Sequence, residues 1–477
     1  MSANRVAPAT LALLLGFAAP LVAADIAVTT AIDVDFDDPD CSLREAIVAA
    51  NDDVAYHGCP AGSGPDRILF DLAPLPATIA LGAALPPIDA SVLLRGPAAG
   101  VVELDGQGLW PILDVSTNTP GVWFGIEDLI LVDGAGAAGG ALVVGEGTRA
   151  ELRRVRLLNN SATVGGGAIW VAGTLAQPTS ALIEDCEIWG NSSAGGSGGG
   201  ALRLLGPGAS ATIRRSLVGS NTADIFNGGA VAIQNGDLAL DRVTFSGNSA
   251  DGSGGAIHVN ASSADVALSL VDSTIAYNTA NLDADASGDG GGVSVVPQGA
   301  FRVSFAVRNS IVAANLDAGG TIDPDLFFSN SAQVDWQSSG FNLIGSNAGA
   351  TALVGSGLPN VHGDYVGSVA SVLDPRLDVL NDWGEGALAT HRPLLSPLSP
   401  AIDAGSCPGS TGDQRRFGDA VAGTRLVDFA AVPNGIASDG CDIGAHERAG
   451  VPGSDRELFR DGFEAGHTLL WSSDVPG

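Results

Sequence analysis

A short phrase recurs six times between residues 154 and 315, and this repetition limits the possible folds more than any other feature. Each copy closes on Asn, with an apolar residue three places before it and a small residue five places before it. The closing residues, spaced by 31, 30, 27, 30 and 37 positions, are Asn160, Asn191, Asn221, Asn248, Asn278 and Asn315. Gly-Gly-Ala recurs nearby, beginning at residues 166, 199, 228 and 254. A regular period of this length is typical of a solenoid, in which each repeat forms one coil.

Each repeat contains two short segments that alternate with period two, as strands with one buried face do. Examples are residues 200–205 and 211–216. No amphipathic helical pattern occurs between residues 70 and 365, which argues against helical repeats of similar period. The sequence therefore predicts an all-β protein. We expect a single-stranded, right-handed parallel β-helix over residues 71–365, a short N-terminal capping helix and an irregular C-terminal region.

The Asn column is expected at the turns between strands. Asn tolerates left-handed backbone, and its amide can bond the Asn of the next coil, since coils stack about 4.8 Å apart. Loss of one such buried amide is expected to cost about 1–3 kcal/mol, because its partners stay unpaired. Ligand contact by these residues is the alternative, but turn ladders account for them fully.

The first 24 residues predict a secretory signal peptide. Arg5 precedes an apolar run over residues 11–24 that ends in small residues, as at a cleavage site. No later stretch is long and apolar enough to span a bilayer as a helix. We therefore expect a chain that is secreted or held at the outer cell surface.

Five cysteines fit such an oxidising compartment. Their positions predict two disulfides, Cys41–Cys59 and Cys407–Cys441, each worth about 3–4 kcal/mol in the loop-entropy description. Cys186 is left over and falls in the small column of the repeat. We expect it to be a buried core thiol rather than a reactive one.

The net charge of −31, from 53 acidic and 22 basic residues, restricts the partners of the chain. A surface of this sign repels nucleic acid and anionic lipid and attracts cations. We therefore expect no nucleic-acid partner and a soluble monomer.

Residues 25–70 contain Cys41-Ser-Leu-Arg-Glu-Ala-Ile-Val-Ala-Ala-Asn51 after an acidic stretch. This region resembles the short N-terminal region named for its Cys-Ser-Leu-Arg-Glu-Ala signature. Ser42 and Glu45 have the spacing of a capping box, which predicts the start of a short helix. We expect this helix to cover the open first coil, whose strand edges would otherwise invite aggregation.

Residues 66–133 resemble the first coils of pectin-lyase-like β-helices, with Thr78-Ile-Ala-Leu81 and Val92-Leu-Leu-Arg-Gly-Pro97. Residues 134–320 resemble the repeats of chlamydial polymorphic outer membrane proteins. Both hallmarks of those repeats occur literally, as Gly254-Gly-Ala-Ile257 and Phe245-Ser-Gly-Asn248. Those proteins are adhesins, so this resemblance implies a role at a cell surface.

Residues 366–448 include Leu373-Asp-Pro-Arg-Leu377, Ser399-Pro-Ala-Ile-Asp-Ala-Gly405 and Cys441-Asp-Ile-Gly-Ala-His-Glu447. These stretches are similar to the choice-of-anchor region of exported bacterial β-helix proteins, which implies association with a surface. A tail over residues 449–477 resembles a short terminal motif of secreted proteobacterial proteins.

One column of alternating charge is the candidate for an active site. It lies six residues before each Asn and reads Arg154, Asp185, Arg215, Arg242, Asp272 and Asn309. A ladder of surface ion pairs explains it, each pair worth well under about 1 kcal/mol. The alternative is a polysaccharide-lyase or hydrolase site, which needs carboxylates and a basic group on one outward face. Its candidate catalytic residues are Asp185, Glu187, Arg215, Arg242 and Asp272.

Calcium is the one small ligand that the sequence favours, and we expect no other cofactor. Its candidate ligands are the acidic residues before the first cysteine, namely Asp33, Asp35, Asp37, Asp38 and Asp40. The spacing of an EF-hand loop is missing, and a solvated acidic loop is the alternative.

Three hypotheses for function remain open. The first is an exported, surface-associated β-helix protein without catalytic activity, an adhesin that contacts glycans or host matrix. The second is a polysaccharide lyase or glycoside hydrolase of the pectin-lyase-like fold. The third is a purely structural surface component. New reducing ends or unsaturated products from polysaccharides would favour the second.

Overall fold

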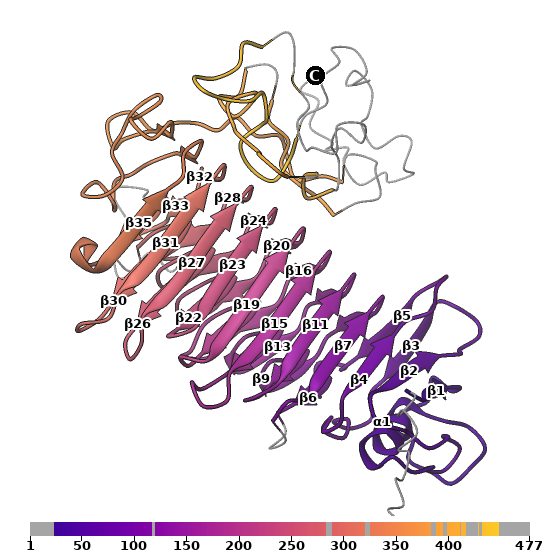
Figure 1. Cartoon of the computed structure of the whole chain (residues 1–477). Coiled ribbons are helices and arrows are strands. Elements are labelled where there is room, and N and C mark those ends of the chain that lie inside the picture. Colours follow the sequence, from indigo (N-terminus) through magenta and orange to yellow (C-terminus); the bar gives the residue numbers. More distant parts are fainter. Residues whose placement is uncertain are drawn as a thin grey trace, which may run out of the picture.

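The computed structural model describes residues 23–116, 120–282, 289–319, 325–382, 388–394, 398–410, 412–415, 428 and 432–447. Nearly all of the predicted signal peptide and the whole of the 449–477 tail lie outside these ranges, so both stay predictions. The described chain winds into a β-solenoid of parallel strands (Figure 1). The predicted solenoid is thus confirmed.

The strands form four parallel sheets, and each central coil contributes one strand to every sheet. Sheet 1 contains β6 (Leu113–Val115), β10 (Leu142–Val144), β14 (Ile169–Ala172), β18 (Leu202–Leu205), β22 (Val231–Gln234), β26 (Ile257–Ala261), β30 (Val293–Pro297) and β34 (Leu326–Phe328). Sheet 2 contains β1 (Asp25–Val28), β2 (Asp66–Phe70), β4 (Val92–Arg95), β7 (Trp123–Glu127), β11 (Arg149–Arg153), β15 (Thr179–Glu184), β19 (Ala209–Arg214), β23 (Asp237–Asp241), β27 (Val266–Val271), β31 (Val303–Arg308) and β35 (Val334–Ser338). Sheet 3 contains β3 (Ala77–Ala80), β5 (Val102–Asp105), β8 (Ile130–Val132), β12 (Arg156–Leu158), β16 (Glu187–Trp189), β20 (Leu217–Gly219), β24 (Thr244–Ser246), β28 (Thr274–Ala276), β32 (Ile311–Ala313), β36 (Leu343–Ile344) and β37 (Tyr365–Val366). Sheet 4 contains β9 (Ala135–Ala138), β13 (Ser161–Gly165), β17 (Ser192–Ser193), β21 (Thr222–Ala223), β25 (Ser249–Ala250), β29 (Thr279–Ala280) and β33 (Leu316–Asp317).

The core lies inside the coils and is built from columns of apolar side chains. The column three places before each Asn pairs in register from coil to coil and is fully buried; its members are Leu157, Ile188, Val218, Phe245, Ile275 and Val312. Alternation along each strand sends these residues inward and their neighbours to the other face. The predicted apolar column is therefore confirmed.

The chain turns within each coil at residues in the left-handed conformation. One such residue directly precedes each ladder Asn, with φ between 52° and 69°; these are Asn159, Gly190, Ser220, Gly247, Tyr277 and Ala314. The expectation that the repeated Asn itself adopts this backbone is therefore wrong by one position. A second left-handed column is the first Gly of the Gly-Gly-Ala phrase, where a Cβ would press against backbone; Gly166 and Gly199 are examples.

The six repeated Asn side chains form a buried ladder along the solenoid. The backbone N–H and Nδ2 of each residue donate to Oδ1 of the next, as from Asn191 to Asn221 at 3.0 and 2.9 Å. The same bonds continue to Asn315, which donates to Oδ1 of Asp325 through both groups. The predicted turn ladder is confirmed, and it ends on a carboxylate.

A shorter ladder runs beside it in the small column. Ser273 N–H donates to Ser310 Oγ at 3.2 Å, and Ser310 N–H donates to Asn342 Oδ1 at 3.1 Å. Asn342 then donates to Asp364. Cys186 occupies this column, and burial raises the pKa of its thiol to about 12, so it is the buried core thiol that the sequence predicts.

The first coil is covered by helix α1 (Leu43–Asp52), at the indigo end of the solenoid (Figure 1). Ser42 caps the helix, and the Glu45 carboxylate accepts the Ser42 N–H at 2.9 Å, so the predicted capping box is present. Leu43 and Ile47 are buried against the solenoid core. The predicted Cys41–Cys59 disulfide fixes the segment before the helix to the segment after it.

The chain after β37 folds back over the outer face of sheet 3 (Figure 1). We call the described residues between 367 and 447 the C-terminal cover. Its apolar side chains form a second core with the outward residues of β28, β32 and β36; the members are Ala276, Ile311, Ala313, Leu343, Leu377, Ala401, Ala404 and Ile443. The predicted Cys407–Cys441 disulfide lies within the cover. A single 3₁₀ turn, η1 (Ser331–Gln333), precedes β35.

Polar contacts also tie the cover to sheet 3. Thr244 Oγ1 donates to Gln414 Oε1 at 2.6 Å, and Ser246 Oγ lies 2.8 Å from His391 Nε2. The outward column that contains Thr244 is charged at Arg156 and Glu187 and is polar or apolar at Thr244, Thr274 and Ile311, where the cover buries it. The mixed character of this column in the sequence is therefore explained.

Candidate functional site

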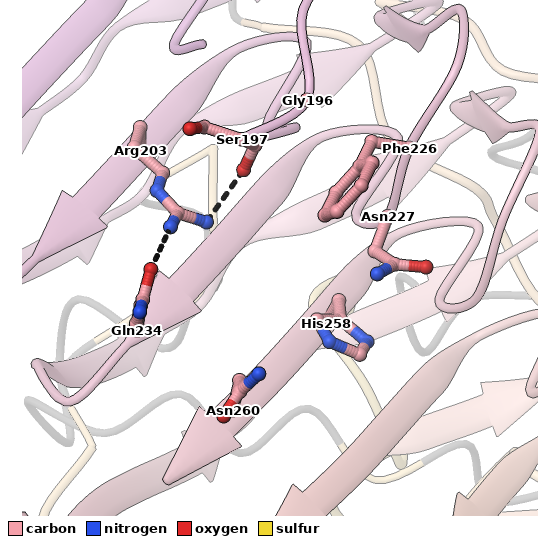
Figure 2. A pocket seen from close by; sticks show the side chains of 8 residues that line it. All are labelled: Gly196, Ser197, Arg203, Phe226, Asn227, Gln234, His258 and Asn260. Carbon is pink, nitrogen blue, oxygen red and sulfur yellow. Dashed lines mark hydrogen bonds between the residues drawn. The ribbon is translucent and has the colours of Figure 1, made fainter. Parts of the chain in front are cut away.

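A polar groove of about 210 Å³ lies on the outer face of sheet 1 (Figure 2). Its floor comes from β18, β22 and β26, and its rim comes from the loops that lead into β18 and β22. The residues that line it are Gly196, Ser197, Arg203, Phe226, Asn227, Gln234, His258 and Asn260. We take this groove as the candidate functional site.

Strand register places these polar residues together. Arg203 pairs with Ala232, and Ala232 pairs with His258, so the three occupy one column on successive coils. Gln234 and Asn260 form the neighbouring column two residues on. Because Ala232 is small, the Arg203 side chain can pass over it and reach Gln234, which lies on the same strand as Ala232 (Figure 2).

Arg203 is a buried cation that has no carboxylate partner among the described residues. Its side chain donates to the Ser197 carbonyl at 2.5 Å and to Gln234 Oε1 at 2.6 Å, and both acceptors are neutral. Only 6% of the residue is exposed, and Nε has no hydrogen-bond acceptor in the described part of the chain. Burial lowers the pKa of Arg203 to about 10, so the guanidinium stays charged at neutral pH.

Three further buried polar atoms on the same sheet as Arg203 have no hydrogen-bond partner among the described residues. They are His258 Nδ1, Asn260 Oδ1 and Ser294 Oγ. Ser294 follows His258 in the same column on the next coil. Buried polar atoms normally have a protein, water or ligand partner, and leaving one unpaired costs about 1–3 kcal/mol. Unpaired atoms on β18, β26 and β30 therefore mark this face as a place for a polar ligand.

His258 is expected to make the protein sensitive to acid. Burial, and secondarily the Arg203 charge, lower its pKa to about 3, whereas an unfolded His titrates near 6.5. Between pH 6.5 and about 3, His258 is therefore protonated in the unfolded state but neutral in the folded state. We expect the free energy of unfolding to fall by up to about 1.4 kcal/mol per pH unit between pH 6.5 and 3.

Urea unfolding of the native protein and the His258→Gln variant at several pH values measures this effect. Groups other than His258 titrate alike in both proteins, so the difference between the two curves isolates His258. The two curves are expected to converge as the pH falls, and curves that stay parallel would contradict the assignment.

The charged column singled out in the sequence lies at the bend between sheets 2 and 3. All its members have a left-handed backbone, with φ between 43° and 58°; they are Arg154, Asp185, Arg215, Arg242, Asp272 and Asn309. Asp and Asn tolerate this conformation better than most residues, so the bend itself favours part of the composition.

Arg215 and Asp185 are brought together across neighbouring coils. Arg215 binds both oxygens of Asp185, at 2.9 and 3.2 Å, and also pairs with Glu184 at 2.7 Å. Glu187 lies on sheet 3 and pairs with Arg156 at 2.6 Å. These contacts form ion pairs of the kind that the surface-ladder interpretation describes.

The other two candidates enter separate interactions. Arg242 pairs with Asp241 at 2.7 Å and donates to the Gly412 carbonyl of the cover at 3.2 Å. Asp272 is buried and accepts a hydrogen bond from Asn309 Nδ2 at 3.0 Å. Catalysis by Asp185, Glu187, Arg215, Arg242 and Asp272 stays a hypothesis.

The acidic residues predicted to bind calcium divide between different partners. Asp33 pairs with Arg44 at 2.7 Å and accepts the Gly82 N–H at 2.8 Å. Asp38 accepts the N–H of Asp40 at 2.9 Å. These three residues thus have roles in the local structure of the segment before α1.

Asp35 instead approaches His57, at 3.1 Å. The Asp35 carboxylate, the Glu45 carboxylate and the His57 ring lie within 4.8 Å of one another, whereas Asp37 is exposed and 3.7 Å from His57. The structure therefore places one of the five predicted ligands beside Glu45 and His57. Calcium binding stays a prediction.

A repeat pattern in the sequence could have revealed that Arg203 and His258 share one column. The residue two places after the phrases that end at residues 141, 168, 201, 230, 256 and 292 forms a column that reads Val143, Trp170, Arg203, Ala232, His258 and Ser294. Alignment on the Asn phrase alone does not reveal it, because the spacing between the two phrases varies.

The fold and the buried turn ladder define the class of protein: a parallel β-solenoid with a polar groove on one outer face. Residues 242–260 match the Chlamydia polymorphic membrane protein repeat, so this match covers β24 to most of β26 and includes His258. No curated protein and no solved structure gives a significant match to the chain. The repeat indicates a surface-associated β-helix protein. Among the described residues, no helix has the length and apolarity needed to cross a membrane.

Proposed function

We propose that this chain is an exported, surface-associated β-solenoid protein that binds glycans through the sheet 1 groove without catalysing a reaction. The observation that carries the proposal is the set of buried, unpaired polar atoms on three groove residues, Arg203, His258 and Asn260. The match to a polymorphic membrane protein repeat supports a location at the outer surface of a bacterium.

Glycans suit the chemistry of this groove. Sugar hydroxyls both donate and accept hydrogen bonds, and the groove offers amides at Gln234 and Asn260 and a neutral imidazole at His258. Phe226 lines the groove with 42% of its surface exposed, so it can contact the apolar face of a sugar ring. A volume of about 210 Å³ is below the ~300–1,000 Å³ of drug-sized ligand clefts, so one sugar unit is the expected occupant.

Binding to a glycan array tests the proposal. We expect the native protein to bind a subset of glycans, and Phe226→Ala to reduce that binding about tenfold, because an aromatic contact contributes about 1–2 kcal/mol. Leu175→Ala is the matched control, since Leu175 is 79% exposed and does not line the groove. It is expected to leave binding unchanged.

The outcomes separate the three functional hypotheses. Release of new reducing ends or unsaturated products from a polysaccharide panel would replace the binding proposal with the lyase or hydrolase alternative. Absence of binding to glycans, host matrix and cells would leave a purely structural surface role. Attachment through the choice-of-anchor-like region 366–448 is part of the same proposal.

A further inference from the structure

We propose that the groove is an anion site and that its glycan is acidic, with a carboxylate or sulfate group paired to the Arg203 guanidinium. The sugar part of this inference rests on the proposed function. The anion part stands on the surroundings of Arg203 alone.

The Arg203 guanidinium has N–H donors that make no hydrogen bond to the described residues. Arg carries five N–H donors, and two of the three nitrogens of Arg203 make one bond each, to Ser197 and Gln234. These two bonds hold the side chain in one orientation, because they come from separate structures, a rim loop and strand β22. One N–H each on Nε, Nη1 and Nη2 remains, and two neighbouring N–H groups of a guanidinium form the fork that a carboxylate or sulfate accepts from.

The electrostatic surroundings also call for an anion. Burying a cation without a counter-ion is costly, and natural proteins normally pair such a group. Burial is the cause that lowers the pKa of Arg203, and for His258 the only charge that contributes is that of Arg203. Among the described residues, no carboxylate pairs with Arg203, although the whole chain carries a net charge of −31.

The rest of the groove selects a sugar rather than a bare ion. His258 and Asn260 lie on β26, two coils from Arg203 on β18, so groups at both ends of one ligand can be bound together (Figure 2). Neutral His258 does not add a second positive charge. The groove thus has a positive charge at Arg203 and neutral polar groups at His258 and Asn260. A sugar with one anionic group near Arg203 and hydroxyls near the other two residues matches this arrangement.

Calorimetric titration of the full chain with D-glucuronate and with D-glucose tests the inference. We expect glucuronate to bind at least tenfold tighter than glucose. Arg203→Gln is expected to remove that preference, so that the variant binds the two sugars with similar affinity. Arg149→Gln, at an exposed arginine on β11, is the matched control and is expected to retain the preference.

The variants remain informative if Arg203→Gln fails to fold. Arg203→Lys keeps the charge but loses the fork, so it is expected to keep a weakened preference for glucuronate. A glucuronate preference of equal size in the native protein and in a folded Arg203→Gln protein would overturn the inference.

Acetate, sulfate and glucose 6-sulfate distinguish the sources of the anion. Tighter binding of glucuronate and glucose 6-sulfate than of acetate or sulfate supports an acidic sugar. Equal binding of the free ions would reject the sugar and the proposed function but keep the anion site. Binding of glucose as tightly as glucuronate would reject the anion site and keep the proposed function.

Discussion

Replacement of Asn221 by alanine is expected to lower the free energy of unfolding by about 3–5 kcal/mol. Oδ1 of Asn221 accepts two hydrogen bonds from Asn191, and its Nδ2 donates to Asn248 Oδ1 and to the Ile188 carbonyl at 2.9 and 3.0 Å. Alanine removes all four bonds at a fully buried position, and the Asn191 N–H is left without its acceptor. Urea unfolding followed by circular dichroism measures the loss.

Asn330 provides the control for this experiment. It is exposed, and its Nδ2 donates at 2.7 Å to Gln333 in the same loop. Asn330→Ala is therefore expected to change stability by less than about 0.5 kcal/mol. If Asn221→Ala proved as mild as Asn330→Ala, the ladder would not contribute to stability as argued.

Serine at both Cys407 and Cys441 is expected to open the C-terminal cover. The bridge closes a segment with a sequence separation of 34 residues, for which the loop-entropy relation gives about 4 kcal/mol. Loss of that contribution exposes the apolar residues that the cover buries on sheet 3, among them Ile311 and Leu343. We expect a rise in the fluorescence of a hydrophobic dye and rapid proteolysis within the cover.

The solenoid itself is expected to survive this change, because its strands and its Asn ladder lie outside the cover. Cys186→Ser is the matched exchange of sulfur for oxygen. Serine occupies the same column at residues 216, 273 and 310, so the Cys186→Ser variant is expected to behave like the native protein. Loss of the whole circular dichroism signal in the double serine variant would show that the cover and the coils unfold together.

The sequence predicts the coil interior well because packing there obeys a strict period. Leu157 and Ile188 had to face inward, since a strand alternates and the neighbouring positions are mixed or small. The N-terminal helix was equally accessible, because Ser42 and Glu45 form a purely local capping pattern.

The groove and the cover could not be derived in the same way. Burial of Arg203 depends on rim loops of irregular length, which no periodic pattern specifies. Contact of His391 with Ser246 joins residues 145 positions apart and obeys no repeat. The left-handed turn residue also lies one position before the repeated Asn. The Asn side chain forms the ladder, and the residue directly before it adopts the left-handed backbone.

The two carboxylates that end the ladders give each ladder a direction and a defined end. Every Asn in the main ladder both accepts and donates, so the chain of amides could in principle continue with each added coil. Asp325 accepts from Asn315 and, when ionised, has no N–H to pass on; Asp364 does the same for Asn342. An aspartate carboxylate at these positions ends the ladder because it accepts hydrogen bonds but cannot donate one to a following residue. Coils can therefore be added or lost between Gly134, where the main ladder begins, and Asp325 without leaving an amide of that ladder unpaired.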